Sequence, residues 1–170
     1  MICPACNLEN IEGADRCENC LTPLRDLDVS RPEAAEGLSR SVLEDHLSLL
    51  EPEETISVKP DTPAYDVVQL MKAARSGCAL VIETGKLKGI FTEHDVLQRM
   101  TGNNAAATST SVMELMSPNP ELLREADCIA SALNKMSLGR YRHIPILKSD
   151  GSYGVTSIKS VLKYIAGEDW

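Results

Sequence analysis

Aromatic residues are scarce in this sequence, which has one Phe, one Trp and four Tyr among 170 residues. Such a chain has few aromatic platforms on which single-stranded bases stack. It also lacks any run of the roughly 18 apolar residues that a transmembrane helix requires. The first residues show neither the charged region nor the apolar region of a secretory signal. We therefore expect a cytoplasmic protein with no membrane segment.

Positive charge is in deficit as well. The 17 Lys and Arg residues are outnumbered by 25 Asp and Glu residues, which leaves a net charge of −8. This balance disfavours non-specific attraction to nucleic acid and to anionic membranes. A nucleophile elbow, a His-Glu-x-x-His helix and a Walker lysine loop are also missing from the sequence. The sequence therefore predicts a protein that is not an enzyme and that meets its partners through specific sites.

Four of the six cysteines lie within the first twenty residues, where Cys3 and Cys6 form one Cys-x-x-Cys pair and Cys17 and Cys20 form another. Each pair directs two thiolates at one ion, so two pairs complete the tetrahedral thiolate set of a structural zinc site. Two redox pairs or two disulfides are the alternatives. A redox pair normally begins a helix in a βαβ fold, and no such pattern surrounds these cysteines. We predict a structural Zn²⁺ held by all four thiolates.

Residues 1–24 therefore resemble the short zinc ribbons of bacterial and archaeal proteins, which bind nucleic acid, bind protein or dimerise. So short a segment buries little apolar surface, and the metal would supply its folding free energy. The segment is acidic, which makes its surface poor for phosphates. We expect contact with an unknown protein partner rather than with nucleic acid. Residues 25–38 are polar and lack apolar periodicity, so they predict a linker.

An internal repeat decides the predicted fold. Gly89–Leu97 aligns with Gly154–Leu162 at an offset of 65 residues, and the same offset pairs Met71 with Met136 without a gap. Each repeat predicts a strand, a helix, two strands and a second helix. The predicted class is α/β (α+β), with two tandem pseudo-symmetric β-α-β-β-α units packed as a pair. The predicted domains are a zinc ribbon at 1–24, a linker at 25–38 and two units at 39–104 and 105–170.

Apolar periodicity places the elements within each repeat. The first repeat predicts strands at 56–58, 78–82 and 89–91, a helix at 64–71 and a helix from residue 92. The second repeat predicts strands at 121–123, 144–147 and 154–156, a helix at 129–136 and a helix from residue 157. Residues 39–50 carry a helical apolar stripe that must cover a surface further along the chain. Cys78 and Cys128 stand alone in apolar segments and are expected to be core residues.

Residues 40–166 resemble a pair of cystathionine-β-synthase (CBS) domains, the Bateman module. The resemblance rests on the segment Gly89–Asp95, on the strand Arg142–Ile146 and on the duplication itself. It implies a regulatory module, usually dimeric, that binds AMP, ADP, ATP or S-adenosylmethionine in the cleft between its two domains. The alternative is a ligand-free CBS dimer that serves as a scaffold for a zinc ribbon that binds protein or nucleic acid.

Thr92 and Asp95 begin the last helix of the first repeat and allow two interpretations. They can form a capping box, or they can hold a ligand whose ribose hydroxyls both donate to the carboxylate. The second repeat keeps a hydroxyl at Ser157 but has Ser160 in place of the acid. We therefore expect one ligand site per chain, because only the first cleft is predicted to contain the carboxylate and the phosphate donors.

Basic residues cluster near the second repeat's buried strand and last helix. Arg142 and His143 directly precede the strand, and Lys159 lies in the first turn of the helix, where its charge opposes the helix dipole. A bound phosphate would account for this placement, and solvated surface charge is the alternative.

The arrangement resembles one nucleotide site in the γ subunit of AMP-activated protein kinase. That resemblance implies that the first repeat holds ribose and phosphate, that the basic residues hold phosphate and that Glu121 and Leu122 line the adenine. It is weakened by Gly77, which stands where the relative has a further phosphate-binding Arg. The residues predicted to bind the ligand are Thr92, Asp95, Glu121, Leu122, Arg142, His143, Pro145 and Lys159.

Overall fold

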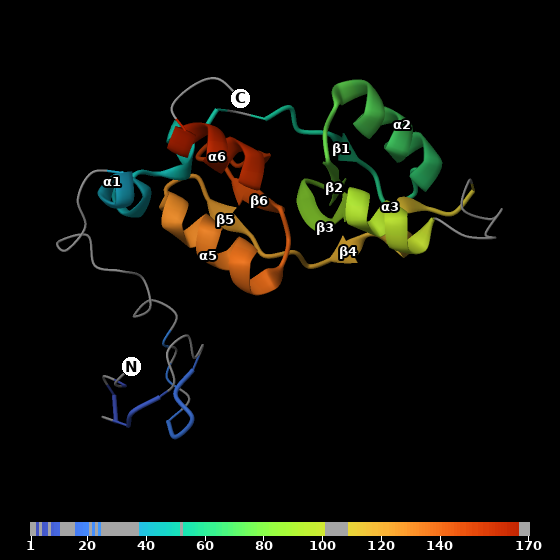
Figure 1. Cartoon of the computed structure of the whole chain (residues 1–170). Helices are drawn as coiled ribbons and strands as arrows, with labels where there is room; N and C mark the ends of the chain where they lie inside the picture. Colours follow the sequence, from blue (N-terminus) through green and yellow to red (C-terminus); the bar gives the residue numbers. More distant parts are fainter. Residues whose placement is uncertain are drawn as a thin grey trace.

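The computed structural model describes residues 3, 5–6, 8–10, 16–20, 22, 24, 38–51, 53–100 and 109–166, without the side chains of 38–40. Within these residues two α+β units lie side by side (Figure 1). The predicted linker lies outside the described residues except for its last residue, Leu38, which begins helix α1. No helix in the described part of the chain combines the length and the hydropathy that a membrane crossing requires.

The first unit has the predicted order of elements. It contains β1 (Ser57–Val58), α2 (Ala64–Ala74), β2 (Cys78–Glu83), β3 (Lys86–Thr92) and α3 (Glu93–Arg99). β1 runs parallel to β2, and β2 and β3 form an antiparallel hairpin. Helix α2 buries Ala64, Val67 and Met71, which recur at helical spacing, in one core cluster with Phe91 of β3.

The second unit repeats this arrangement and confirms the duplicated α+β fold. It contains β5 (Leu123–Arg124), α5 (Ile129–Gly139), β6 (His143–Leu147), β7 (Tyr153–Ser157) and α6 (Ile158–Ala166). β5 is parallel to β6, and β6 and β7 are antiparallel, as in the first unit. Ile129, Ala132 and Met136 of α5 are buried in one cluster with Ile144 of β6.

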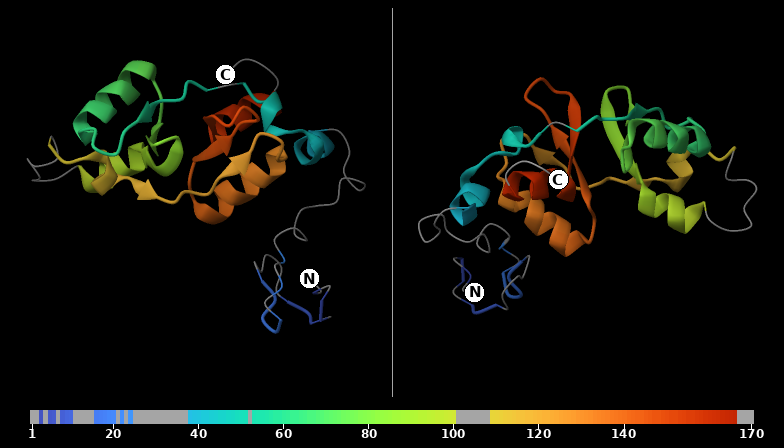
Figure 2. Two further views of the ribbon diagram at one scale, coloured as in Figure 1. Left: turned by 180° about the vertical axis from the view of Figure 1, so that it is seen from behind. Right: turned by 45° about the horizontal axis from the view of Figure 1, so that its top comes forward.

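Each unit is completed by a segment that the predicted boundaries assign to the other. Helix α4 (Val112–Leu115) and strand β4 (Ser117–Pro118) add Val112 and Met116 to the core of the first unit. Helix α1 (Leu38–Glu44) and the 3-10 helix η3 (Leu47–Leu49) precede the first unit, yet Leu47 and Leu50 lie in the core of the second. The chain thus crosses between the units on opposite sides, near residues 53–57 and 118–123 (Figures 1 and 2).

The two crossings obey the same repeat. An isolated bridge joins His46 to Cys128, and a second bridge joins Ser111 to Pro63. The first pair becomes the second when 65 is added to one residue and subtracted from the other. The apolar stripe predicted at 39–50 therefore covers the second unit, and its helix is interrupted between Glu44 and Leu47.

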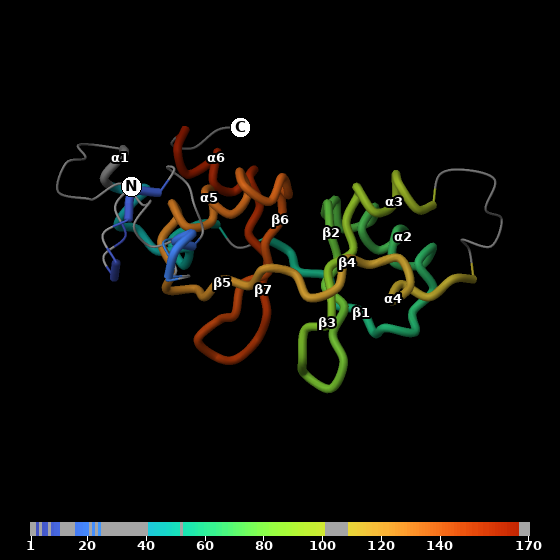
Figure 3. Tube along the Cα trace, turned by 90° about the horizontal axis from the view of Figure 1, so that it is seen from below, coloured from blue at the N-terminus to red at the C-terminus, as the bar shows by residue number. Residues whose placement is uncertain are grey.

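The units meet through their sheets. Cys78, Leu80 and Ile90 of the first unit share a buried cluster with Val155 of the second. Cys78 is 3% exposed, so it is a core residue as predicted, whereas Cys128 is only partly buried and is the N-cap of α5. Both hairpin turns project from the same side of the pair (Figure 3). This packing leaves the ends of β3, β6 and β7 close together at the boundary between the units.

The two sheets differ at one edge, where only the first has a fourth strand in the described residues. β4 pairs with β3 through Ser117 and Pro118, so the first sheet has four strands. In the described residues the second sheet has only three, and no strand continues β7 outward. The offset of 65 relates Pro118 of β4 to Glu53, which belongs to no strand. Glu53 makes a side-chain contact with Ser157 instead.

Candidate functional site

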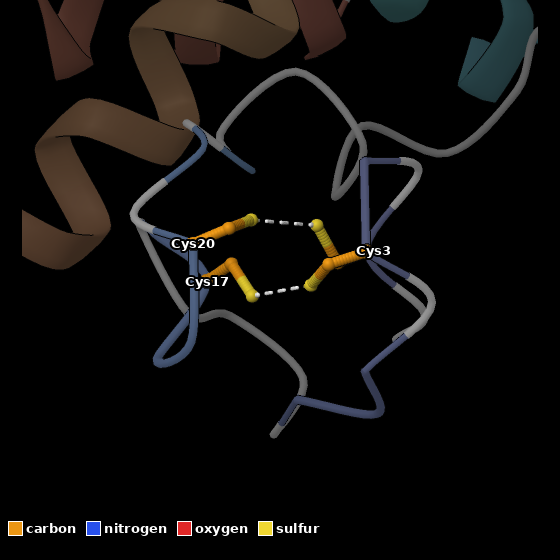
Figure 4. A group of neighbouring side chains, drawn as sticks. Cys3, Cys17 and Cys20 are labelled. Atoms are coloured by element: carbon orange, nitrogen blue, oxygen red, sulfur yellow. Dashed lines mark hydrogen bonds between the residues drawn. The ribbon is translucent and has the colours of Figure 1, made fainter.

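The four N-terminal cysteines come together as the sequence predicts. Their sulfur atoms all lie within 4.8 Å of one another. Cys3 Sγ lies 3.5 Å from Cys20 Sγ, and Cys6 Sγ lies 3.5 Å from Cys17 Sγ (Figure 4). These separations are too long for a disulfide. They are close to the ~3.8 Å between sulfurs that a tetrahedral ion with ~2.3 Å bonds requires.

The two Cys-x-x-Cys pairs also have the same backbone hydrogen bond. Cys3 N donates to Leu8 O at 2.9 Å, and Cys17 N donates to Thr22 O at 2.9 Å, so both pairs close the same turn. Hydrogen bonds from the backbone, led by that of Cys20, lower the pKa of Cys17 to about 6. A thiolate is the form in which cysteine binds a metal. These four residues could hold one metal ion and would fill all four positions of a tetrahedral coordination shell.

A cavity of about 490 Å³ lies between the units beside Thr92, and we call it the Thr92 cavity. Its lining includes Thr92, His94, Glu121, Tyr141, Arg142 and His143. Thr92 ends β3 and His94 lies in the first turn of α3. Tyr141 and Arg142 join α5 to β6, and His143 begins β6. The sequence prediction missed Tyr141. Its only signal is its position directly before the two basic residues.

Tyr141 is held in place by the end of α5. Arg140 adopts the left-handed conformation, with φ of 54°, and turns the chain out of the helix. A Cβ on Gly139 would lie 1.8 Å from the Tyr141 ring, so only glycine fits beneath the ring. Burial, and secondarily the charge of Glu121, raises the pKa of Tyr141, which therefore stays a neutral phenol at pH 7.

Asp95 forms the capping box rather than facing the Thr92 cavity. Its Oδ2 accepts from Thr92 N at 2.9 Å and from Thr92 Oγ1 at 2.7 Å, and its Oδ1 accepts from Ser117 Oγ at 3.0 Å. Arg99 lies 3.7 Å from the same carboxylate. Asp95 is 3% exposed, and a ribose could reach its carboxylate only if these bonds were exchanged.

A second cavity of about 470 Å³ lies beside Ser157, and we call it the Ser157 cavity. Its lining includes Glu53, Arg75, Arg142, His143, Ser157 and Lys159. Arg142 and His143 line both cavities. A Cβ on Gly77 would lie 2.7 Å from the His143 ring, so the absence of a side chain at Gly77 makes room for the imidazole. Burial lowers the pKa of His143, against the opposing effect of the Glu53 and Glu93 charges.

A carboxylate reaches the Ser157 cavity from an unexpected part of the chain. Ser157 Oγ donates to Glu53 Oε1 at 2.5 Å, across 104 residues of sequence. Ser160 replaces the acid of the capping box with its hydroxyl, which accepts from Ser157 N at 3.1 Å. The expectation that this cleft lacks both a carboxylate and phosphate donors is therefore wrong, because Glu53 and Lys159 line it.

The predicted ligand-binding residues are divided by the structure. Thr92, Glu121, Arg142 and His143 share the Thr92 cavity. Lys159 lines the other cavity, because α6 directs its first turn there, and the repeat-equivalent residue in the Thr92 cavity is His94. The remaining three, Asp95, Leu122 and Pro145, are not among the lining residues of either cavity. Leu122 is 40% exposed, whereas Pro145 is fully buried in β6.

Comparison with known proteins places this geometry in a class. Residues 52–102 match the model of the CBS domain family. The CBS domain-containing protein CBSCBSPB5 of Arabidopsis thaliana is 34% identical over 118 residues, which cover 68% of this chain and 22% of that protein. The chain thus spans about a fifth of the length of this and two further Arabidopsis thaliana relatives.

Solved structures agree with this fold. A CBS-domain containing protein from Agrobacterium tumefaciens is 27% identical, with a TM-score of 0.61 over 66% of this chain and 90% of its own. CBSX2 in complex with AMP has a TM-score of 0.59 at 20% identity, over 71% of this chain and 96% of its own. The CBS domain pair of protein MJ0100, in complex with 5′-methylthioadenosine and S-adenosyl-L-methionine, has a TM-score of 0.62 at 15% identity, over 73% of this chain and 98% of its own.

Together these matches show that the chain has the fold of a CBS-domain pair. The two repeats correspond to the two units of such a pair, and the two cavities lie between them.

Proposed function

We propose that this protein is a cytoplasmic, non-enzymatic regulator that binds an adenosine-containing ligand in the Thr92 cavity. The observation that carries the proposal is the combination of an aromatic ring, a carboxylate and basic groups around one cavity: Tyr141, Glu121, Arg142 and His143. A volume of about 490 Å³ lies within the range of small-molecule sites. The liganded CBS-domain neighbours support the choice of an adenosine compound.

The lining residues divide naturally between the parts of a nucleotide. Tyr141 offers a neutral ring on which a purine can stack. Arg142 and His143 offer donors to a phosphate. Glu121 accepts from Lys135 at 2.6 Å and, being partly exposed, can also accept from a sugar or an exocyclic amine. We retain Asp95 as a ribose acceptor only on the condition that the capping box opens.

Calorimetry with AMP on the full chain tests this proposal. We expect one AMP per chain and a loss of at least tenfold in affinity for Tyr141→Ala. Tyr153→Ala, which removes a ring from the interface between the sheets, is the matched control and should retain the affinity. Absence of binding by AMP, ATP and S-adenosylmethionine would reject the proposal.

We further propose that the four cysteines hold a structural Zn²⁺ and that the ribbon contacts a protein partner. Zinc with four thiolates would order the segment and would leave no position for a catalytic water. The CBS pair is proposed to form a homodimer through its helices. Leu97 of α3 is 65% exposed and its repeat-equivalent Leu162 of α6 is 46% exposed, so both units present an apolar side chain at the same place.

A ligand-free scaffold is the second candidate, and the engagement of Asp95 favours it. The carboxylate already has three hydrogen bonds within the protein, so capping accounts for its presence without a ligand. In that case the dimer and the zinc site would form as proposed, and the thermal midpoint would be unchanged by AMP.

A further inference from the structure

The Ser157 cavity differs from the Thr92 cavity in what its hydroxyl contacts. Thr92 Oγ1 donates to Asp95, within the same capping box and away from the cavity lining. Ser157 Oγ donates to Glu53, which itself lines the Ser157 cavity. The Glu53 carboxylate thus accepts the hydrogen bond that the Ser157 hydroxyl would donate to a bound anion.

We propose that Glu53 is an internal competitor for phosphorylated ligands at the Ser157 cavity. The proposal rests on the proposed function, since it assumes that a phosphate-bearing adenosine compound is the ligand. The phosphate and the Glu53 carboxylate would need the same donor, Ser157 Oγ, in a cavity that the cations Arg142 and Lys159 also line. Two anions at one hydroxyl repel each other, so the phosphate binds only when Glu53 leaves.

Glu53 is kept in place by the segment that carries it. Lys163 of α6 donates to Glu51 Oε2 at 2.9 Å, and Leu50 and Leu47 are buried in the second unit's core. The competitor is therefore anchored on the unit that it blocks. Its effective concentration at Ser157 stays high, and a free ligand must overcome it.

The first unit has no equivalent competitor. The offset of 65 relates Glu53 to Pro118, which is uncharged and pairs with Gly89 as part of β4. Glu93 and Glu121 line the Thr92 cavity, but the Thr92 hydroxyl donates to Asp95, which does not line it. The two cavities consequently differ in one respect: a carboxylate that lines the cavity is hydrogen-bonded to the hydroxyl in the Ser157 cavity but not in the Thr92 cavity. One ligand per chain is expected for this reason, and not because the second cleft lacks binding groups.

The charges around the Ser157 cavity predict the effect of removing the competitor. Glu51, Glu53, Glu54 and Glu93 face Arg75, Arg142, Lys159 and Lys163 around it. The formal charges balance. Glu53→Gln leaves one positive charge in excess and puts a neutral amide of the same size in place of the carboxylate at Ser157, so a phosphate meets no second anion there. The lining then favours a phosphate.

Calorimetry with AMP on the full chain tests the inference. Wild type should bind one AMP per chain, and Glu53→Gln should bind two. The affinity of Glu53→Gln for the second AMP should be at least tenfold higher than that of wild type for any second AMP. Glu54→Gln is the control, since it removes the same charge from the same cavity without touching Ser157. In the Glu53→Gln background, Lys159→Ala should abolish the added site and Tyr141→Ala should leave it.

The outcomes separate the two proposals. One AMP per chain for wild type and also for Glu53→Gln would overturn the competitor and leave the Thr92 site intact. Two equally tight sites in wild type, or the same gain in Glu54→Gln, would also overturn it. If no protein in the series binds AMP, the proposed function fails and the inference fails with it.

Discussion

His143 lines both cavities, as Arg142 does, and its ring packs against Gly77. Its basic character was visible in the sequence, as was that of Arg142, since polar residues directly before a buried strand stand out. Glu53 and Tyr141 were not visible in that way. Glu53 reaches Ser157 only because the chain crosses between units, and Tyr141 faces a cavity only because Arg140 turns the backbone.

Burial of His143 predicts a pH dependence of stability. Because burial lowers its pKa in the folded state, the unfolded chain takes up the proton first as the pH falls. The free energy of unfolding should therefore decrease as the pH falls below about 6.5, until the folded-state pKa is reached. Urea unfolding of wild type and His143→Gln can be compared at about pH 7.5 and about pH 5, on either side of the unfolded-state pKa. The free energy of unfolding should decrease less for the variant than for wild type. His94→Gln, which replaces a histidine at an exposed position, is the control variant.

Gly77 predicts a coupled pair of substitutions. Gly77→Ala places a Cβ 2.7 Å from the His143 ring and should reduce the free energy of unfolding by about 1–3 kcal/mol. His143→Ala removes the ring, so the double variant should be more stable than the sum of the two single effects predicts. Additive losses in urea unfolding would show that the glycine is not needed to make room for the imidazole.

At the scale of elements, periodicity predicted both long helices and the buried strands, because each carries a complete apolar pattern. The exchange of segments was not predictable in this way. β4 contains two residues, too few for a pattern, and residues 39–50 show an apolar stripe without showing which unit it covers. The predicted domain boundaries follow the order of the repeats, whereas packing assigns η3 to the second unit and α4 to the first.

The exchanged segment predicts a contrast within η3. Leu47 is 2% exposed in the second unit's core, so Leu47→Ala should reduce the free energy of unfolding by about 2–4 kcal/mol. Leu49 lies two residues away and is 62% exposed, so Leu49→Ala should cost less than about 0.5 kcal/mol. Equal effects in urea unfolding would contradict the docking of this segment on the second unit.

At the scale of the whole molecule, the cysteine cluster predicts a separable metal domain. Cys17→Ser should lower the zinc content of the purified protein below one ion per chain, because it removes one of the four thiolate ligands. Cys128→Ser should retain the ion, since Cys128 is the N-cap of α5 and is not one of the four clustered cysteines. Elemental analysis gives the metal content, and AMP affinity should be unchanged in both variants. Wild-type protein free of zinc after preparation under reducing conditions would contradict the proposed zinc site.

The proposed dimer is tested on the two equivalent leucines of α3 and α6. Replacing Leu97 and Leu162 together by Glu introduces charge where the interface is expected, and should convert the dimer to a monomer in light scattering. Leu49→Glu changes an equally exposed leucine elsewhere and should leave the dimer intact. A monomeric wild type would contradict the proposal directly.

The central claim is that one adenosine-containing ligand binds each chain in the Thr92 cavity of a zinc-bearing CBS pair. Native mass spectrometry of the full chain with AMP added counts both components in a single measurement. The account predicts one zinc and one AMP per chain for wild type, and one zinc without AMP for Tyr141→Ala. A spectrum in which wild type acquires no AMP, or in which Tyr141→Ala acquires as much as wild type, would contradict it.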